Sequence, residues 1–474
     1  MRLERFKVLS EKEIAEIHDV TVKVLSETGV RVLSEKALDM LEKGGATVDK
    51  TAKTAKFSPG LIDRCIKSVP REFALYNREG TESMVIGDRN PKYAAGHNAI
   101  FMVDPFTNKR RYSKVEDIEQ FGIIADKLTD IDIVGIPLNP QDVPPKETLL
   151  YAIKALYETT GKPLFFSTDS YAVNHSAIEM MKATAKNGDI AQYPNAVSQL
   201  SPTSPLYWEA GAIDSLIDTS TNMVPLVILP EPIAGLTAPY SVSGLLTMHN
   251  AETVSGIVIS QTAKKGAPLL YGSSWTTYDM KNNTAIIGSP ETTLLRIAIS
   301  QMADYYNVPA HTTAPNDDAN AHDEHMTWEK VLSSFCSAGA RNDIIMNSGM
   351  FSCGLSISLE QLILDDEMNG YERRICRGIN VTGEAISADT IQRIGHGESF
   401  MMEDLTFKNL RSGEFHAYKM QYLPNYKNWM DAGAPDAVAV ANRKAKEYLS
   451  GGSAHPLDEK RKDALAEIIK KFTG

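Results

Sequence analysis

Apolar and polar positions follow a repeated order along this chain: a short apolar run, a small polar loop, then a segment with helical periodicity. The clearest runs lie between Leu226 and Phe351 and begin at Leu226, Pro268, Val308 and Asp343. A buried strand that ends in a polar lip and is followed by a helix is the repeating unit of a parallel α/β barrel. The pattern therefore predicts a barrel whose polar lips form the functional site.

Eight such units follow one another. The expected strands are Ala99–Val103, Ile131–Ile136, Pro163–Ser167, Ala196–Leu200, Val224–Leu229, Pro268–Gly272, Val308–His311 and Asp343–Met346. The expected helices are Lys114–Leu128, Lys146–Thr160, Val173–Asn187, Tyr207–Asp218, Tyr240–Lys264, Glu291–Tyr306, Thr327–Ala340 and Ser356–Asn369. Eight strand–helix units predict an α/β fold, a closed (β/α)8 or TIM barrel. The alternative is a doubly wound open sheet, but no run is followed by a Gly-rich phosphate fingerprint.

The segments on either side of these units are expected to be mainly helical. Ser10, Ser34 and Ser58 each have the position of a helix N-cap, and a hairpin-like stretch follows at 72–87. Later helix candidates are 384–394, 436–449 and 458–472. The expected parts are an N-terminal helical cap with a hairpin (1–92), the barrel (93–370) and a C-terminal helical extension (371–474).

Composition and charge narrow the function. Among 474 residues, 43% are hydrophobic and 23% are charged, which is ordinary for a protein with a large core. A formal net charge of -11 argues against nucleic-acid binding, which needs a basic excess. The four cysteines form no C-x-x-C pair, which favours reduced thiols in the cytoplasm. Without an apolar h-region or a run of membrane-spanning length, we expect neither a secretory signal nor a membrane span.

The side chains expected at the strand ends are mostly uncharged. They are His97 and Asn98 (entering the first strand), Asn139, Thr168, Asp169, Gln199, Ser201, Glu231, Ser274, Trp275, Thr277, Tyr278, His311, Thr312, Thr313, Asn347 and Ser348. This set of amides, hydroxyls, histidines, aromatic rings and isolated carboxylates lacks the lysine of a Schiff-base enzyme. It also lacks the paired carboxylates of a glycosidase.

Four residues of this set have candidate roles. Glu231 lies between two prolines, so its position is well defined; it either faces a substrate cation or binds loop amides. Trp275 and Tyr278 are candidates for an aromatic cage, since aromatic faces attract quaternary ammonium groups. Tyr271 lies within a strand and fits core packing. His311 either donates a hydrogen bond to substrate or is structural.

Two further motifs have structural explanations. His322 and His325 share a helix face, but they lack the H-E-x-x-H spacing of a zinc site and begin a helix where acidic residues are stabilising. The stretch from Gly288 to Glu291 resembles a phosphate-binding helix start. Its first-turn glutamate would repel an anion, so we interpret the stretch as a Ser-Pro helix cap.

Several stretches resemble the trimethylamine methyltransferase superfamily. The residues Pro-Glu-Pro-Ile-Ala-Gly-Leu-Thr-Ala-Pro at 230–239 are similar to its P-x-x-G-x-T-A-P-like stretch, and further similar stretches occur in the family's order. They are 288–295, 362–368, 377–380 and 395–401. The resemblance implies a barrel enzyme that passes a methyl group from an amine to the cobalt of a separate corrinoid protein.

The founding members of the superfamily use pyrrolysine, whereas this chain shows only the standard twenty residues. It therefore resembles the non-pyrrolysine branch, whose characterised members demethylate quaternary amines such as glycine betaine, proline betaine and carnitine. A quaternary nitrogen is permanently charged and leaves as a neutral tertiary amine, so the methyl group is already activated. The barrel need only supply orientation, desolvation and a cage.

The resemblance and the lip residues together suggest roles in substrate binding. We expect Glu231, Trp275 and Tyr278 to hold the ammonium head. The residues expected to orient the rest of the substrate are His97, Asn98, Gln199, His311 and Asn347. The nucleophile would be Co(I) of cobalamin carried by a cognate corrinoid protein, with no cofactor bound tightly in this chain and no catalytic side chain. The C-terminal helical segment offers a surface for self-association.

Two other functions are compatible with the pattern. One is a metal-dependent barrel hydrolase or lyase, which needs several His and carboxylate ligands converging at the lips. The other is a quaternary-amine binding protein without turnover. Glycine betaine is the first choice of substrate, followed by proline betaine and carnitine.

Overall fold

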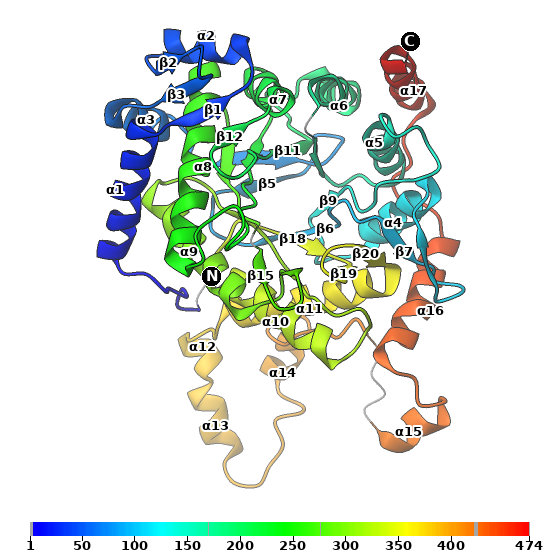
Figure 1. Cartoon of the computed structure of the whole chain (residues 1–474). Coiled ribbons are helices and arrows are strands. Elements are labelled where there is room, and N and C mark those ends of the chain that lie inside the picture. Colours follow the sequence, from blue (N-terminus) through cyan, green and yellow to red (C-terminus); the bar gives the residue numbers. More distant parts are fainter. Residues whose placement is uncertain (1–2, 169, 275, 421–424, 474) are drawn as a thin grey trace.

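The fold is a closed eight-stranded parallel barrel surrounded by helices (Figure 1). This computed structural model describes residues 3–168, 170–274, 276–420 and 425–473. The barrel strands are β6 (Lys92–Ala95), β9 (Ile133–Gly135), β10 (Leu164–Ser167), β11 (Ala196–Leu200), β13 (Leu226–Ile228), β14 (Leu269–Tyr271), β17 (His311–Thr313) and β18 (Ile344–Ser348). Their order is β14-β13-β11-β10-β9-β6-β18-β17. A parallel bridge between Tyr271 and Ala310 joins β14 to β17 and closes the ring.

A helix follows each barrel strand, as the sequence predicts. These helices are α4 (Val115–Lys127), α5 (Thr148–Thr159), α6 (Tyr171–Thr184), α7 (Ala210–Thr221), α8 (Val242–Ala263), α9 (Pro290–Tyr305), α10 (Glu324–Gly339) and α11 (Leu359–Arg377). The (β/α)8 prediction is confirmed and the open sheet is excluded. In the described part of the chain, no helix is both long and apolar enough to cross a membrane.

The predicted position of the first strand, Ala99–Val103, is wrong. The barrel strand is β6, and the chain turns after it because Gly96 and Asn98 have φ angles of 76° and 57°. Within the expected range, β7 (Phe101–Val103) pairs instead with two strands outside the barrel, β8 (Arg110–Tyr112) and β20 (Ser356–Ser358). β19 (Met350–Phe351) completes that sheet. His97 and Asn98 therefore follow the first strand rather than entering it.

The N-terminal segment closes the end of the barrel at which the strands begin. The hairpin of β4 (Phe73–Tyr76) and β5 (Ser83–Ile86) places Leu75 and Ile86 in one buried cluster with the interior barrel residues. The preceding elements are α1 (Glu11–Glu27), β1 (Val30–Val32), α2 (Glu35–Lys43), β2 (Thr47–Asp49), β3 (Thr54–Lys56) and α3 (Pro59–Ile66). β12 (Tyr207–Trp208) joins the small sheet of β1, β2 and β3. Ser10, Ser34 and Ser58 cap α1, α2 and α3 as predicted.

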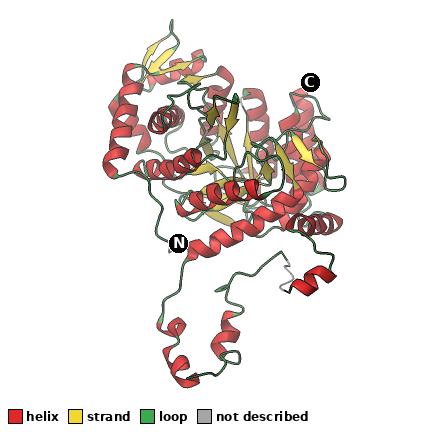
Figure 2. Cartoon of the chain, turned by 60° about the horizontal axis from the view of Figure 1, so that its bottom comes forward, coloured by secondary structure: helices red, strands yellow, loops and turns green. Residues whose placement is uncertain are grey.

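The helices after α11 divide into two groups (Figures 1 and 2). α16 (Ala437–Ser450) packs against α11 and α4, and α17 (Glu459–Thr473) packs against α6 and α5. The short helices project from the body; they are α12 (Gly383–Ile386), α13 (Ala388–Ile394), α14 (Asp404–Asn409) and α15 (Tyr426–Asp431). The division at 92/93 and 370/371 stays a prediction; α11 continues past the second of these boundaries to Arg377.

Candidate active site

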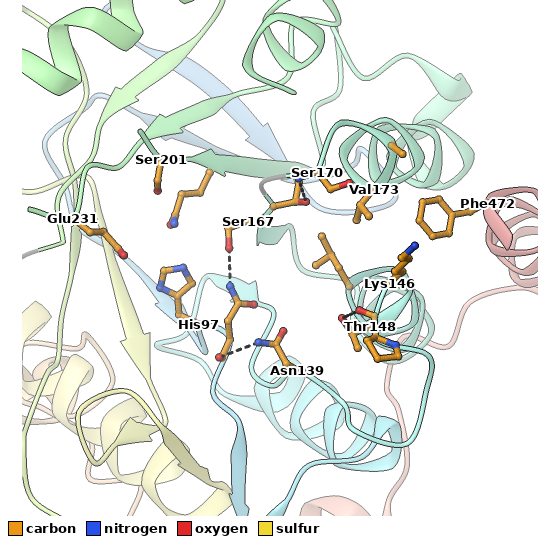
Figure 3. A pocket seen from close by; sticks show the side chains of 16 residues that line it. His97, Asn139, Lys146, Thr148, Ser167, Ser170, Val173, Ser201, Glu231 and Phe472 are labelled. Carbon is orange, nitrogen blue, oxygen red and sulfur yellow. Dashed lines mark hydrogen bonds between the residues drawn. The ribbon is translucent and has the colours of Figure 1, made fainter. Parts of the chain in front are cut away.

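A cavity of about 910 Å³ lies at the carboxyl ends of the barrel strands (Figure 3). Its walls come from the loops after β6, β9, β10 and β13, from β11, from the starts of α5 and α6, and from α17. The lining residues are His97, Asn98, Asn139, Pro145, Lys146, Thr148, Leu149, Ser167, Thr168, Ser170, Ala172, Val173, Gln199, Ser201, Glu231 and Phe472. This is the face on which barrel enzymes carry their active sites.

The backbone after β6 holds His97 in place. Gly96 has a positive φ, and a Cβ atom there would lie 2.7 Å from the Cα atom of Pro137, so only glycine fits without a shift. Asn98 donates from Nδ2 to Ser167 Oγ at 2.6 Å, and Asn139 Nδ2 donates to the Asn98 carbonyl at 3.3 Å. These bonds tie three neighbouring lips together (Figure 3).

The surroundings of the cavity disfavour the charged forms of His97 and Glu231. Burial lowers the pKa of His97 to about 4, and an interaction with Gln199 offsets this only in part, so the imidazole is neutral near pH 7. Burial raises the pKa of Glu231, against a hydrogen bond with Ser274, although the side chain is accessible from the cavity. Figure 3 shows both side chains pointing into the same part of the cavity.

Polar atoms without partners lie below the cavity. The two ring nitrogens of the fully buried His311 have no hydrogen-bond partner among the described residues. The His311 ring stacks on the Phe165 ring with 5.2 Å between the ring centroids, and the Phe165 ring meets the His97 ring edge-on with 6.0 Å between the centroids. An unpaired buried polar atom costs about 1–3 kcal/mol, so a polar ligand group reaching these atoms would be favoured.

The structure brings together four of the eight expected substrate-binding residues: His97, Asn98, Gln199 and Glu231 line the cavity. His311 lies inside the barrel, and Asn347 donates from Nδ2 to Asn316 Oδ1 at 2.5 Å, apart from the cavity lining. Tyr278 lies on the hairpin of β15 (Thr277–Asp279) and β16 (Thr284–Ile286) and donates to Asn283 Oδ1 at 2.6 Å. Trp275, and Asp169 of the wider lip set, lie outside the described residues.

Sequence reasoning missed the outer end of the cavity. Lys146 and Thr148 lie at the start of α5, and Phe472 comes from α17 (Figure 3). The loop after β9 was a detectable signal for Lys146, since every βα-loop of a barrel is a candidate wall. Phe472 left no such signal, because one aromatic residue on an amphipathic helix is typical of core packing.

The two motifs interpreted as helix starts, 288–291 and 322–325, lie at the beginnings of α9 and α10. Ser289 caps α9 by accepting a hydrogen bond from the Thr292 amide, which confirms the cap interpretation. His322 lies 3.2 Å from Ser358 Oγ, whereas His325 contacts Glu329 at 2.8 Å, so the two rings have different partners. Within the described ranges, no three His, Cys, Asp or Glu side chains gather as they would around a metal ion.

The closed parallel barrel with a polar cavity at its carboxyl edge defines the class as a TIM-barrel enzyme. Residues 1–473 match the family model described as trimethylamine methyltransferase (MTTB), and the chain belongs to that family and is a methyltransferase. Trimethylamine methyltransferase MttB of Desulfitobacterium hafniense (strain DSM 10664 / DCB-2) is 30% identical over 98% of this chain and 93% of its own. Glycine betaine methyltransferase of Desulfitobacterium hafniense (strain Y51) is 26% identical over 90% and 89%.

A solved structure supports the fold independently. The monomethylamine methyltransferase MtmB of Methanosarcina barkeri aligns with a TM-score of 0.53 over 97% of this chain and 92% of its own. Sequence identity is 13%, so this likeness concerns the fold alone. The family resemblance expected from the sequence motifs is confirmed.

Proposed function

We propose that the protein transfers a methyl group from a quaternary amine to Co(I) of a corrinoid carried by a separate cognate protein. The observation that carries this proposal is that the Glu231 carboxyl group and a neutral His97 line one cavity, whose described lining contains no cysteine. A carboxylate stabilises a permanent cation, whereas a charged imidazole would repel it.

The reaction needs few protein groups. A nucleophile donates an electron pair to the methyl carbon, the C–N bond breaks, and its electron pair stays on nitrogen, which leaves as a neutral tertiary amine. The reduced corrinoid of the partner would supply the nucleophile. In this chain, Glu231 would bind the ammonium head, and the amide groups of Asn98 and Gln199 would orient the remaining part of the substrate.

Glycine betaine is the proposed substrate, with proline betaine and carnitine next. A relative named for glycine betaine supports this order, and the cavity is large enough for the bulkier candidates. Lys146 lies towards the end of the cavity away from Glu231, where its ammonium would favour a substrate carboxylate (Figure 3). Tyr278, a candidate for the aromatic cage, does not line this cavity. Glu231 is therefore the principal partner proposed for the cation.

Two parts of the proposal concern the surroundings of the enzyme. The corrinoid would approach the open carboxyl edge of the barrel, and no cofactor would bind tightly to this chain alone. We also propose a cytoplasmic location, because Cys65, Cys336, Cys353 and Cys376 are all free thiols.

The decisive experiment supplies reduced cobalamin, and then the reduced cognate corrinoid protein, with glycine betaine, proline betaine, carnitine or trimethylamine. The absorbance change on methylation of the corrinoid reports transfer. We expect turnover with one quaternary amine, none with trimethylamine, and a strong loss in Glu231→Gln, with Glu291→Gln on α9 as the control. Betaine binding without transfer to the cognate protein would instead identify a binding protein.

A further inference from the structure

One end of the cavity is built by a helix that does not belong to the barrel. Phe472, on α17, lines the same cavity as Glu231, which follows barrel strand β13. Figure 3 shows Phe472, Val173 and Lys146 at the end of the cavity away from Glu231. We call the end with Phe472 the outer end and the end with Glu231 the inner end.

The outer end has an apolar wall made by three helices. Leu149 at the start of α5 and Val173 on α6 are each 9% exposed and belong to one buried cluster, and the half-buried Phe472 packs against that cluster. The inner end is lined by amide, hydroxyl, imidazole and carboxyl groups instead. A ligand would therefore gain by placing an apolar part against the outer wall and its polar part at the inner end.

The direction of α17 explains how Phe472 reaches the cavity. Ser453 Oγ donates to the carbonyl oxygen of Thr159 at 2.9 Å, and the Leu457 amide donates to that of Glu158 at 3.4 Å, so the segment before α17 lies at the C-terminal end of α5. The 15 residues of α17 span about 22 Å at 1.5 Å per residue. This length carries the chain back along α5 to its start, where Phe472 meets the cavity.

Other contacts fix α17 in this position. Arg461 in its first turn pairs with Glu79, in the turn between β4 and β5, at 2.9 Å. Leu465 and Ile469 are buried in the cluster that also contains Leu149 and Val173. The position of Phe472 is therefore set by the packing of the whole helix and not by a loop.

The outer end suits a particular kind of substituent. Its apolar wall lies beside the ammonium group of Lys146, so it suits an apolar chain that ends in a carboxylate. Glycine betaine has one methylene group between its nitrogen and its carboxylate. A ligand whose ammonium head lies at Glu231 contacts Phe472 only if it carries a longer chain.

We propose that Phe472 is a specificity-determining residue, which together with Leu149 and Val173 binds the chain of the substituent that stays on the nitrogen. The inference rests on the proposed function, because that function places the ammonium head at Glu231. Contact with Phe472 favours longer chains over shorter ones. It does not act on the methyl group that is transferred.

The test measures ligand affinity by calorimetry without any corrinoid. The ligands are glycine betaine and its butanoate and hexanoate homologues, each with a trimethylammonio group on the terminal carbon. We expect the wild type to bind the hexanoate homologue more tightly than glycine betaine. In Phe472→Ala, the ratio of the two affinities should fall about tenfold, the usual effect of a lost hydrophobic contact of this kind.

Three further variants separate contact from folding. Phe472→Leu keeps an apolar side chain and should keep most of the ratio. Val173→Ala should lower the ratio without any change in α17. Phe407→Ala, a control on α14 where the ring is 51% exposed, should give the wild-type ratio. Circular dichroism melting checks that each variant is folded.

The outcomes distinguish this inference from the proposed function. If glycine betaine binds but the ratio is unchanged in Phe472→Ala and Val173→Ala, the inference is wrong and the proposed function stands. Equal weakening of every ligand would show a purely structural role and would also overturn it. Hexanoate without a nitrogen probes the outer end alone: Phe472-dependent binding of it, with no binding of the quaternary amines, would support the inference and refute the ammonium site. A wild type that binds neither kind of ligand overturns both.

Discussion

At the level of single residues, burial acts on His97 and Glu231 in opposite directions. Both side chains lose hydration in the same cavity, which disfavours the charged form of each. The imidazole therefore stays neutral, while the carboxyl group ionises only at higher pH than a free glutamate. A bound cation would reverse the shift of Glu231, so this residue links substrate affinity to pH.

We predict that kcat/KM for the quaternary substrate falls as the pH is lowered through the pKa of Glu231. The apparent pKa should lie above 4.5, the ordinary value for this side chain. The quaternary nitrogen carries no proton and His97 is neutral down to about pH 4, so neither contributes this acidic limb. Glu231→Gln should flatten the profile and lower kcat/KM at pH 8 about 30-fold or more. A limb that persists in Glu231→Gln would contradict the assignment.

A second prediction concerns stability and His311. Burial lowers its pKa to about 3, so below pH 6.5 the unfolded chain binds a proton that the folded chain does not. The free energy of unfolding should therefore fall by about 2 kcal/mol from this residue between pH 7 and pH 5. Urea denaturation of wild type and His311→Asn at both pH values measures the difference.

The control for that measurement is His175→Asn, because His175 is exposed on α6, where its ring stacks on Tyr171 and lies 3.1 Å from Asp218 Oδ2. The pH dependence of stability should be smaller in His311→Asn than in wild type and unchanged in His175→Asn. Equal pH dependence in all three proteins would show that His311 can be protonated in the folded state.

The sequence predicts those site residues whose position follows from a strand end. Gln199 lies near the end of one apolar run and Glu231 just after another, and the parallel sheet then places both at one edge. Phe472 could not be assigned to the cavity, because its position depends on how α17 crosses α5 and α6. Such tertiary packing leaves no local pattern in the chain.

At the level of elements, the hairpin of β4 and β5 fills the amino end of the barrel. The first strand shows how a local pattern can mislead there. Ala99–Val103 is the more apolar run, but β6 contributes the buried Tyr93, Ala94 and Ala95. Positive φ angles at Gly96 and Asn98 separate the two runs, and neither angle can be inferred from hydrophobicity alone.

The hairpin carries a stability prediction. Leu75 is fully buried among the interior strand residues, so Leu75→Ala should lower the free energy of unfolding by about 3 kcal/mol. Val85→Ala on the same hairpin is the control, since Val85 is 41% exposed and its loss should cost under about 0.5 kcal/mol. Chemical denaturation measures both, and kcat should change little because the hairpin is remote from the cavity. Equal losses would place Leu75 outside the core.

At the level of the whole molecule, the cavity wall is built from residues that lie far apart in the sequence, and this has a consequence for biosynthesis. Its residues extend from His97 to Phe472, so the first and last of them leave the ribosome roughly 20–75 s apart at ordinary elongation rates. During that interval the nascent barrel has no complete wall with which to hold a ligand. Substrate can therefore stabilise only the complete chain. Until then, the growing chain depends on its own packing, such as the core around the β4–β5 hairpin.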